Sequence, residues 1–78
     1  MTETDPATEH TLHCLGYNVR LKRKELGLRQ HDLSEKTGIS QKHISLIERG
    51  QMNVTVNQMQ RLASALSSTV QSLLSESE

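Results

Sequence analysis

Two helical patterns joined by a four-residue turn constrain the fold of this 78-residue chain more than any other feature. Within the turn, residues 37–40, Gly38 can adopt the left-handed conformation that a Cβ disfavours, and Ser40 can cap the helix that follows. In that second helix Ile44 and Ile47 lie three residues apart on one face, which predicts that they are buried. The opposite face carries Lys42, Ser45, Leu46 and Arg49. The pattern is the layout of a helix-turn-helix motif.

Helical periodicity continues on both sides of the motif, and no segment alternates like a strand. One tyrosine and no Phe or Trp leave Leu, Ile, Val, Met and Ala to form the core, which suits an all-α bundle. Gly27 and Gly50 are expected to end the first and third helices, and Thr55 with Gln58 forms a capping box for the fourth. The five expected helices start near Leu12, Gln30, Gln41, Val56 and just after Ser67 or Ser68. The expected inner faces are Leu12, Leu15, Val19 and Leu26 in the first helix, Leu33 in the second, and Val56, Met59, Leu62, Ala63 and Leu66 in the fourth.

The length allows one domain. Residues 1–10 are acidic and contain the only proline, so we expect a flexible acidic arm there, with a capping lead-in to the first helix as the alternative for residues 1–7. A helical domain over residues 11–75 and a tail over residues 76–78 are expected to follow. No apolar run approaches the roughly twenty residues of a membrane helix, and the N-terminus lacks the order of a signal peptide. We therefore expect a cytoplasmic protein that does not meet a membrane. Cys14 has no internal partner for a disulfide, and we expect it to be a small buried residue rather than a redox site.

The formal net charge is zero, but the charges are distributed unevenly. Residues 11–30 carry five Lys and Arg against Glu25 alone, residues 31–50 are balanced, and both ends of the chain are acidic. Electrostatic attraction responds to the local field within a Debye length of about 8 Å, so distant acidic ends screen a basic segment little. The basic segment 11–50 can therefore attract a polyanion although the net charge of the chain is zero.

No group of side chains supports catalysis or a bound cofactor. His10, His13 and Cys14 lie close in sequence, but a structural zinc site normally has four ligands at recognisable spacings, and the other two histidines lie on other helices. Residues 31–34 include His, Asp and Ser, which helical geometry sends to different faces, so they form no triad. We expect no enzymatic activity, no metal and no cofactor.

The segment from Gly16 to about Leu66 resembles the lambda-repressor/Cro (Xre-type) family of bacterial and phage transcriptional regulators. The matching runs are Arg20-Leu-Lys-Arg-Lys-Glu-Leu-Gly-Leu, Gln30-x-x-Leu33, Gly38-Ile-Ser-Gln and Ile44-Ser-Leu-Ile-Glu-Arg-Gly50. A single glycine between helices is commonplace, whereas this ordered set is specific. The resemblance implies a five-helix, lambda-repressor-like DNA-binding domain whose second motif helix reads the major groove of double-stranded DNA.

The resemblance also implies the roles of individual side chains. The base contacts fall on Gln41, Lys42, Ser45 and Leu46, where Gln pairs with adenine and Lys with guanine, each worth about 1–3 kcal/mol of discrimination. Ser45 could serve a phosphate instead, and Leu46 is either a contact to a thymine methyl or a singly exposed leucine. The phosphate contacts fall on Arg29, Gln30, Ser40, Arg49 and Asn53.

Two further features follow from the family pattern. Arg23 and Glu48 occupy positions that form a partly buried salt bridge in many members. Arg29 stands where the family usually has a Ser or Thr N-cap, and an arginine cannot accept a hydrogen bond from the free backbone N–H groups, which costs about 1 kcal/mol of helix stability.

We expect a homodimer that binds a palindromic operator and represses by blocking polymerase. The apolar surplus expected to form the dimer interface is Val54, Val56, Val70, Leu73 and Leu74, with a place in the core as the alternative for Leu73. Activation stays open, because Asp32 and Glu35 could face RNA polymerase and small controller proteins of restriction–modification systems do both. The competing function class is a protein-interaction module or antitoxin-like adaptor, which the neutral net charge and acidic ends favour.

Overall fold

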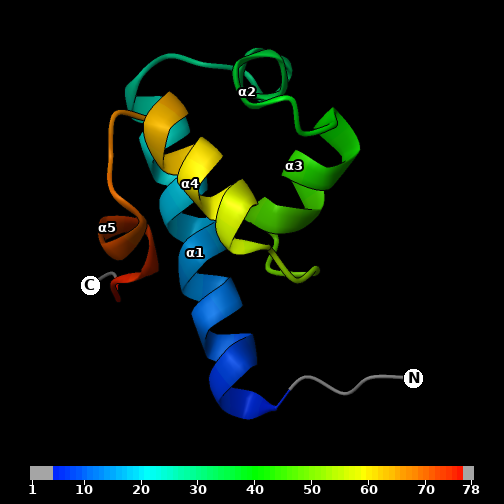
Figure 1. The fold of residues 1–78 in the computed structure, drawn as a ribbon, viewed down its shortest axis with the longest axis vertical. Coiled ribbons are helices and arrows are strands. Elements are labelled where there is room, and N and C mark those ends of the chain that lie inside the picture. Colours follow the sequence, from blue (N-terminus) through cyan, green and yellow to red (C-terminus); the bar gives the residue numbers. More distant parts are fainter. Residues whose placement is uncertain (1–4, 77–78) are drawn as a thin grey trace.

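The computed structural model describes residues 5–76, which form five helices and no strand (Figure 1). The helices are α1 (Pro6–Glu25), α2 (Gln30–Thr37), α3 (Gln41–Glu48), α4 (Val56–Ala65) and α5 (Val70–Leu74). The predicted all-α class and the number of helices are confirmed. The outermost parts of the expected arm and tail, residues 1–4 and 77–78, lie outside the described residues.

Helix α1 begins earlier than the sequence analysis placed it. The Asp5 carboxylate accepts a hydrogen bond from the Thr8 backbone N–H at 2.9 Å, and Pro6 occupies the first helical position. An acid at the N-cap followed by proline is a helix start, because proline lacks the N–H that this position would leave unpaired. Residues 6–10, assigned to a flexible arm, are therefore helical, and Figure 1 shows this end of α1 extending beyond the other helices.

The core lies where α1, α3, α4 and α5 meet, with α2 packed on α3 and α4. Its buried members are Leu15, Val19, Leu33, Ile39, Ile44, Ile47, Leu62, Ala63, Leu66 and Leu73. Three predicted inner residues lie outside the core. Leu12 is half-buried and does not belong to the core cluster. Leu26 is 48% exposed because it is the C-cap of α1, and Val56 is 73% exposed because it is the first residue of α4, before that helix reaches the core. None of the described helices combines the length and the apolar character needed to cross a membrane.

The local signals that position α3 behave as expected. Gly38 has a φ of +76°, and the Ser40 hydroxyl caps α3 by accepting from the His43 backbone N–H at 3.2 Å. Thr37 is buried, where its hydroxyl donates to the Leu33 carbonyl at 2.8 Å and accepts from the Ile39 N–H at 3.1 Å. These bonds pair the polar groups of the turn without water.

Helices α4 and α5 are capped by threonines. The predicted box between Thr55 and Gln58 is present, with hydrogen bonds of 3.0 and 2.9 Å in the two directions. The cap of α5 is Thr69, not Ser67 or Ser68 as predicted, because Ser67 takes a left-handed φ of +54° in the turn that leaves α4. Helix α5 therefore starts at Val70.

Candidate nucleic-acid interface

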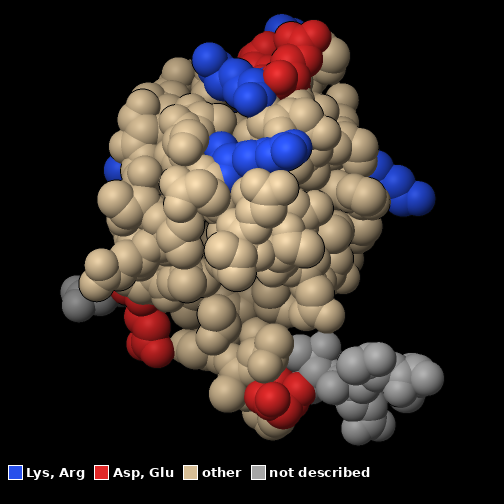
Figure 2. Space-filling model, viewed as in Figure 1, with Lys and Arg blue, Asp and Glu red and all other residues tan. Residues whose placement is uncertain are grey.

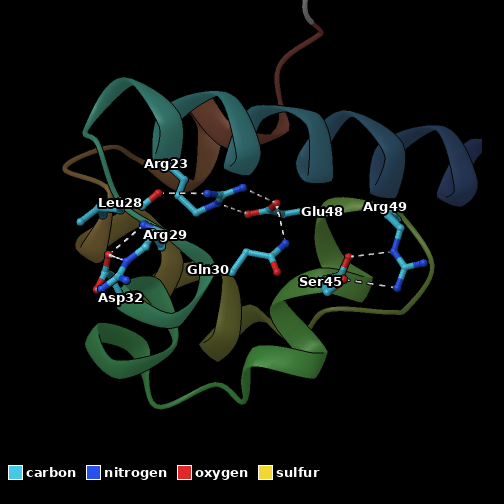
Figure 3. A network of polar contacts seen from close by, with 8 residues as sticks. All are labelled: Arg23, Leu28, Arg29, Gln30, Asp32, Ser45, Glu48 and Arg49. Carbon is cyan, nitrogen blue, oxygen red and sulfur yellow. Dashed lines mark hydrogen bonds and ion pairs between the residues drawn. The ribbon is translucent and has the colours of Figure 1, made fainter.

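A buried ion pair holds the C-terminal end of α3 against α1. Arg23 donates from Nε to Glu48 Oε2 at 2.7 Å and from Nη2 to Glu48 Oε1 at 3.0 Å, and its Nη1 donates to the Leu28 carbonyl at 2.9 Å (Figure 3). The two side chains are 11% and 3% exposed. The ion pair that the family resemblance implied is thus present, and it is bidentate, which fixes the direction as well as the separation of the two groups.

Gln30, at the start of α2, joins the same network. Its Nε2 donates to Glu48 Oε1 at 3.1 Å, and Figure 3 shows the Gln30 amide turned toward Glu48. Gln30 was predicted as a DNA contact, to a phosphate or an outer base, and its bond to Glu48 was not predicted because sequence spacing does not reveal which helix ends meet. With one amide hydrogen engaged, Gln30 retains its second N–H for a phosphate oxygen. The network therefore ties together α1, α3 and the start of α2.

Arg29 lies just before α2 and is paired with Asp32. The Arg29 backbone N–H donates to Asp32 Oδ2 at 2.8 Å, and its guanidinium lies 3.3 Å from the same oxygen. The Asp32 carboxylate thus makes one half of a capping box by pairing the Arg29 N–H, whereas the Arg29 side chain accepts no cap hydrogen bond from the first turn. Hydrogen bonding from the Arg29 side chain, and then from its backbone N–H, holds the pKa of Asp32 below its ordinary value. Asp32 therefore stays ionised beside a cation that is itself exposed.

The outer face of α3 is polar at its beginning and half-buried toward its end. Gln41 and Lys42 are exposed, whereas Ser45 and Leu46 are half-buried. Arg49 folds back along the helix, with Nε 3.3 Å from the Ser45 carbonyl and Nη2 3.3 Å from the Ser45 hydroxyl (Figure 3). Gln41 and Lys42 are thus open to a ligand, while Ser45 lies beneath Arg49.

The remaining predicted phosphate contacts surround this face. Ser40 is exposed at the start of α3, and Asn53 is exposed in the loop between α3 and α4. The face in Figure 2 carries Lys and Arg side chains on its upper part, whereas acidic side chains lie at the lower end, near the two chain termini, and beside α2 at the top. The acidic side chains near the two ends of the chain thus lie away from the upper part, where acidic and basic side chains stand together.

The two acids expected to face polymerase do not form a free patch. Asp32 is engaged by Arg29, and Glu35 lies with Oε2 3.2 Å from His31 Nε2. Each acid thus has a basic neighbour about one helical turn away, and these two pairs were not predicted from the sequence.

The expected dimer surface is only partly exposed. Leu73 is 0% exposed and belongs to the core, so its assignment to the interface was wrong. Its place is fixed by α5 packing on α1, where Asn18 Nδ2 donates to the Leu73 carbonyl at 2.8 Å and the Ser75 carbonyl at 2.7 Å. The other four are Val56, which is exposed, and Val54, Val70 and Leu74, which are partly buried against the core.

Helix α1 carries His10, His13 and Cys14. Cys14 is buried, as predicted, with its Sγ 3.6 Å from His10 Nε2, and the same His10 nitrogen lies 2.9 Å from Glu76 Oε2. Within residues 5–76 no cluster of three His, Cys, Asp or Glu side chains has an arrangement suited to a metal ion.

Comparison with known proteins identifies the family. The family model of the helix-turn-helix HTH_3 matches residues 19–73. An uncharacterized HTH-type transcriptional regulator, y4dJ of Sinorhizobium fredii, is 40% identical over 52 residues, which cover 67% of this chain and 68% of that protein. A hypothetical transcription factor of Neisseria meningitidis is 32% identical over 60 residues, but the match covers only 57% of that protein.

Solved structures agree on the fold. The restriction-modification controller protein C.AhdI from Aeromonas hydrophila superposes with a TM-score of 0.76 and 32% identity, covering 80% of this chain and 94% of that chain. The hypothetical transcription factor NHTF from Neisseria has a TM-score of 0.82 and 26% identity, covering 97% and 87%. The predicted lambda-repressor-like fold is confirmed. The chain belongs to the HTH_3 (Xre/Cro-type) family of helix-turn-helix DNA-binding transcriptional regulators, which are transcription factors and not enzymes.

Proposed function

We propose that this regulator binds double-stranded DNA sequence-specifically, with α3 in the major groove. One observation carries the proposal: Gln41 and Lys42 are exposed at the start of a helix whose far end is locked by the buried Arg23–Glu48 pair. An exposed donor set on a rigid helix can discriminate bases, since each well-placed pairing is worth about 1–3 kcal/mol. Ser45 and Leu46 extend this reading face once Arg49 swings away from Ser45.

In such a complex we expect Arg49 to bind a DNA phosphate. Its present partners are a neutral carbonyl and a hydroxyl at 3.3 Å, which a phosphate oxygen would replace with a stronger, charge-assisted bond. The other proposed phosphate contacts are Arg29, Gln30, Ser40 and Asn53. These contacts fix orientation and carry no sequence information, so their loss weakens binding to all DNA alike.

We propose further that the protein acts in the cytoplasm as a homodimeric repressor on a two-fold operator. The similarity to C.AhdI, a restriction-modification controller protein, supports a small regulator of this kind. Repression by occlusion is favoured over activation, because Asp32 and Glu35 are each paired with a basic neighbour. The proposed dimer surface consists of Val54, Val56, Val70 and Leu74.

Selection from random double-stranded DNA tests the proposal. We expect the protein to enrich one two-fold symmetric sequence, and Lys42→Ala to enrich a sequence that is degenerate at one position in each half. Lys36→Ala is the matched control, since Lys36 is equally a helix-borne lysine but lies beside α4 at the far end of α2. A protein that binds all DNA equally, or binds none at low salt, would leave the protein-interaction module as the better description.

A further inference from the structure

The recognition helix α3 rests on α1 by direct backbone contact at two glycines. Gly16 is buried in the middle of α1, and a Cβ there would lie 2.8 Å from the Glu48 carbonyl oxygen and closer still to that of Ile47. Gly50 follows α3, and a Cβ there would lie 3.2 Å from the Cα and 3.4 Å from the backbone N of His13. The two contacts lie about one turn apart along α1.

The atoms that surround Gly16 cannot move on their own to make room for a side chain. Its neighbours are backbone carbonyls near the C-terminal end of α3, which cannot rotate away as a side chain does. Real Cβ atoms do not approach within 3.0 Å of such oxygens, so a side chain at Gly16 must force α1 and the C-terminal end of α3 apart. Gly16 has no left-handed backbone, and alanine is the better helix former, so only the contact explains a glycine here.

A displacement at this end of α3 reaches the reading face. Figure 3 shows the C-terminal end of α3, which carries Glu48, lying against α1. The proposed base-reading residues Gln41 and Lys42 begin the same helix, and a rise of 1.5 Å per residue places them about 10 Å from that end. Hydrogen bonds to base edges weaken steeply with distance and angle. A tilt that the core could absorb would therefore misplace the base contacts.

We propose that Gly16 and Gly50 form a backbone seat that sets the depth and tilt of α3, which makes them positioning residues for DNA sequence preference although neither touches DNA. The proposal rests on the proposed function of α3. It adds the residues that position α3 to the residues that contact the bases.

The test compares three glycine-to-alanine variants on the DNA site selected by the wild-type protein and on scrambled DNA. Gly50 and Gly27 share a left-handed backbone, with φ of +68° and +71°, but a Cβ at Gly27 would have no neighbour within 4 Å. Gly27→Ala therefore imposes the same strain as Gly50→Ala without the contact to α1. The readouts are the ratio of the two affinities, circular dichroism, and the sequence that each variant selects.

We expect Gly16→Ala and Gly50→Ala to lower the ratio by about tenfold or more, the equivalent of a lost base contact, and to select altered sequences. Gly27→Ala should keep the wild-type ratio and sequence. Folded Gly16→Ala and Gly50→Ala proteins with the wild-type ratio would overturn the proposal. If Gly16→Ala does not fold, the test rests on Gly50→Ala, whose contact with α1 is milder. Its affinity ratio is then compared with that of Gly27→Ala. A wild-type protein without any preference would instead overturn the proposed function.

Discussion

At the scale of single residues, Glu48 matters most, because three elements meet at its carboxylate. Arg23 from α1 and Gln30 from α2 both donate to it, and the Glu48 side chain is 3% exposed. Burying a charge is compensated only while its partners remain, so removing one member costs about 3–5 kcal/mol whereas removing both costs less. We therefore expect the network to stabilise the observed position of α3 against α1 and α2.

A double-mutant cycle measures this coupling. Arg23→Ala and Glu48→Ala should each lower the free energy of unfolding by about 3 kcal/mol, and the double variant by clearly less than the sum. Urea denaturation of the four proteins provides the measurement. Strict additivity would show that the two helices are not tied at this point.

Asp32 makes the stability depend on pH in a defined direction. Its folded pKa is lowered, first by the hydrogen bond from the Arg29 side chain and then by that from the Arg29 backbone N–H. A lowered folded pKa adds stability that is present above the unfolded pKa, ordinarily 3.8, and that is lost as pH falls through the folded pKa. The contribution should therefore be full at neutral pH and disappear in the acid range.

Denaturation at several pH values checks this assignment. We expect Asp32→Asn to be less stable than the wild type at pH 7 and the difference to vanish as the carboxylate is protonated. Glu35→Gln is the control, because Glu35 is an acid of the same helix whose ion pair is with His31 and not with Arg29. A difference between wild type and Asp32→Asn that stays constant with pH would contradict the assignment.

Arg29 is expected to act on DNA without reading its sequence. Its guanidinium is exposed and its pKa is raised above the ordinary value by the hydrogen bond to Asp32, so it stays charged at any working pH. Arg29→Ala should weaken binding to selected and scrambled DNA by the same factor and reduce the salt dependence by about one counterion. A loss confined to the selected site would make Arg29 a base-reading residue instead.

At the scale of elements, the start of α3 is held by one hydroxyl. The Ser40 side chain caps the helix, and Thr55 does the same for α4. Replacing either residue with alanine should cost about 1 kcal/mol of stability. Only Ser40→Ala should also weaken DNA binding, because it frees the turn that carries Gln41 and Lys42, whereas Thr55→Ala provides a control of similar stability cost. Thermal denaturation and a DNA titration of both variants separate the two effects.

Features held by short-range interactions were predictable from the sequence, whereas contacts between distant elements were mostly not. Gly38 and the box of Thr55 with Gln58 act within one turn, so their structure was predictable from neighbouring residues. Family resemblance supplied the Arg23–Glu48 pair across 25 residues. The hydrogen bond from Gln30 to Glu48 was not predictable, because it depends on how two helix ends meet in space. The start of α1 was misplaced because the acidic, proline-containing stretch was interpreted first as a loose arm, with a capping lead-in only as the alternative.

Leu73 shows the same limit for packing. An apolar residue in a short terminal helix can face the core or a partner, and helical periodicity alone does not choose over five residues. The choice depends on α5 lying against α1, where Asn18 holds the last carbonyls of α5. This contact between distant parts of the chain turns Leu73 inward.

At the scale of the whole molecule, the extents are 33 × 28 × 18 Å, and with α3 as the proposed recognition helix one copy would occupy one half-site. A two-fold pair would place two such helices about 34 Å apart, one turn of B-DNA, which demands a palindromic site. Each copy therefore needs a surface for the other that lies away from α3. The exposed Val56 and the half-buried Val54, Val70 and Leu74 form the proposed surface.

Charged substitutions distinguish this surface from the core. Val56→Glu and Val70→Glu should give folded monomers with greatly weakened binding to the full palindrome, because cooperative occupation of the two half-sites is lost. Leu73→Glu should instead unfold the protein, since it places an unpaired charge at a fully buried position. Analytical ultracentrifugation and circular dichroism of the three variants provide the measurements. A wild-type chain that sediments as a monomer at tens of micromolar, and binds single half-sites as tightly as palindromes, would rule out the dimer.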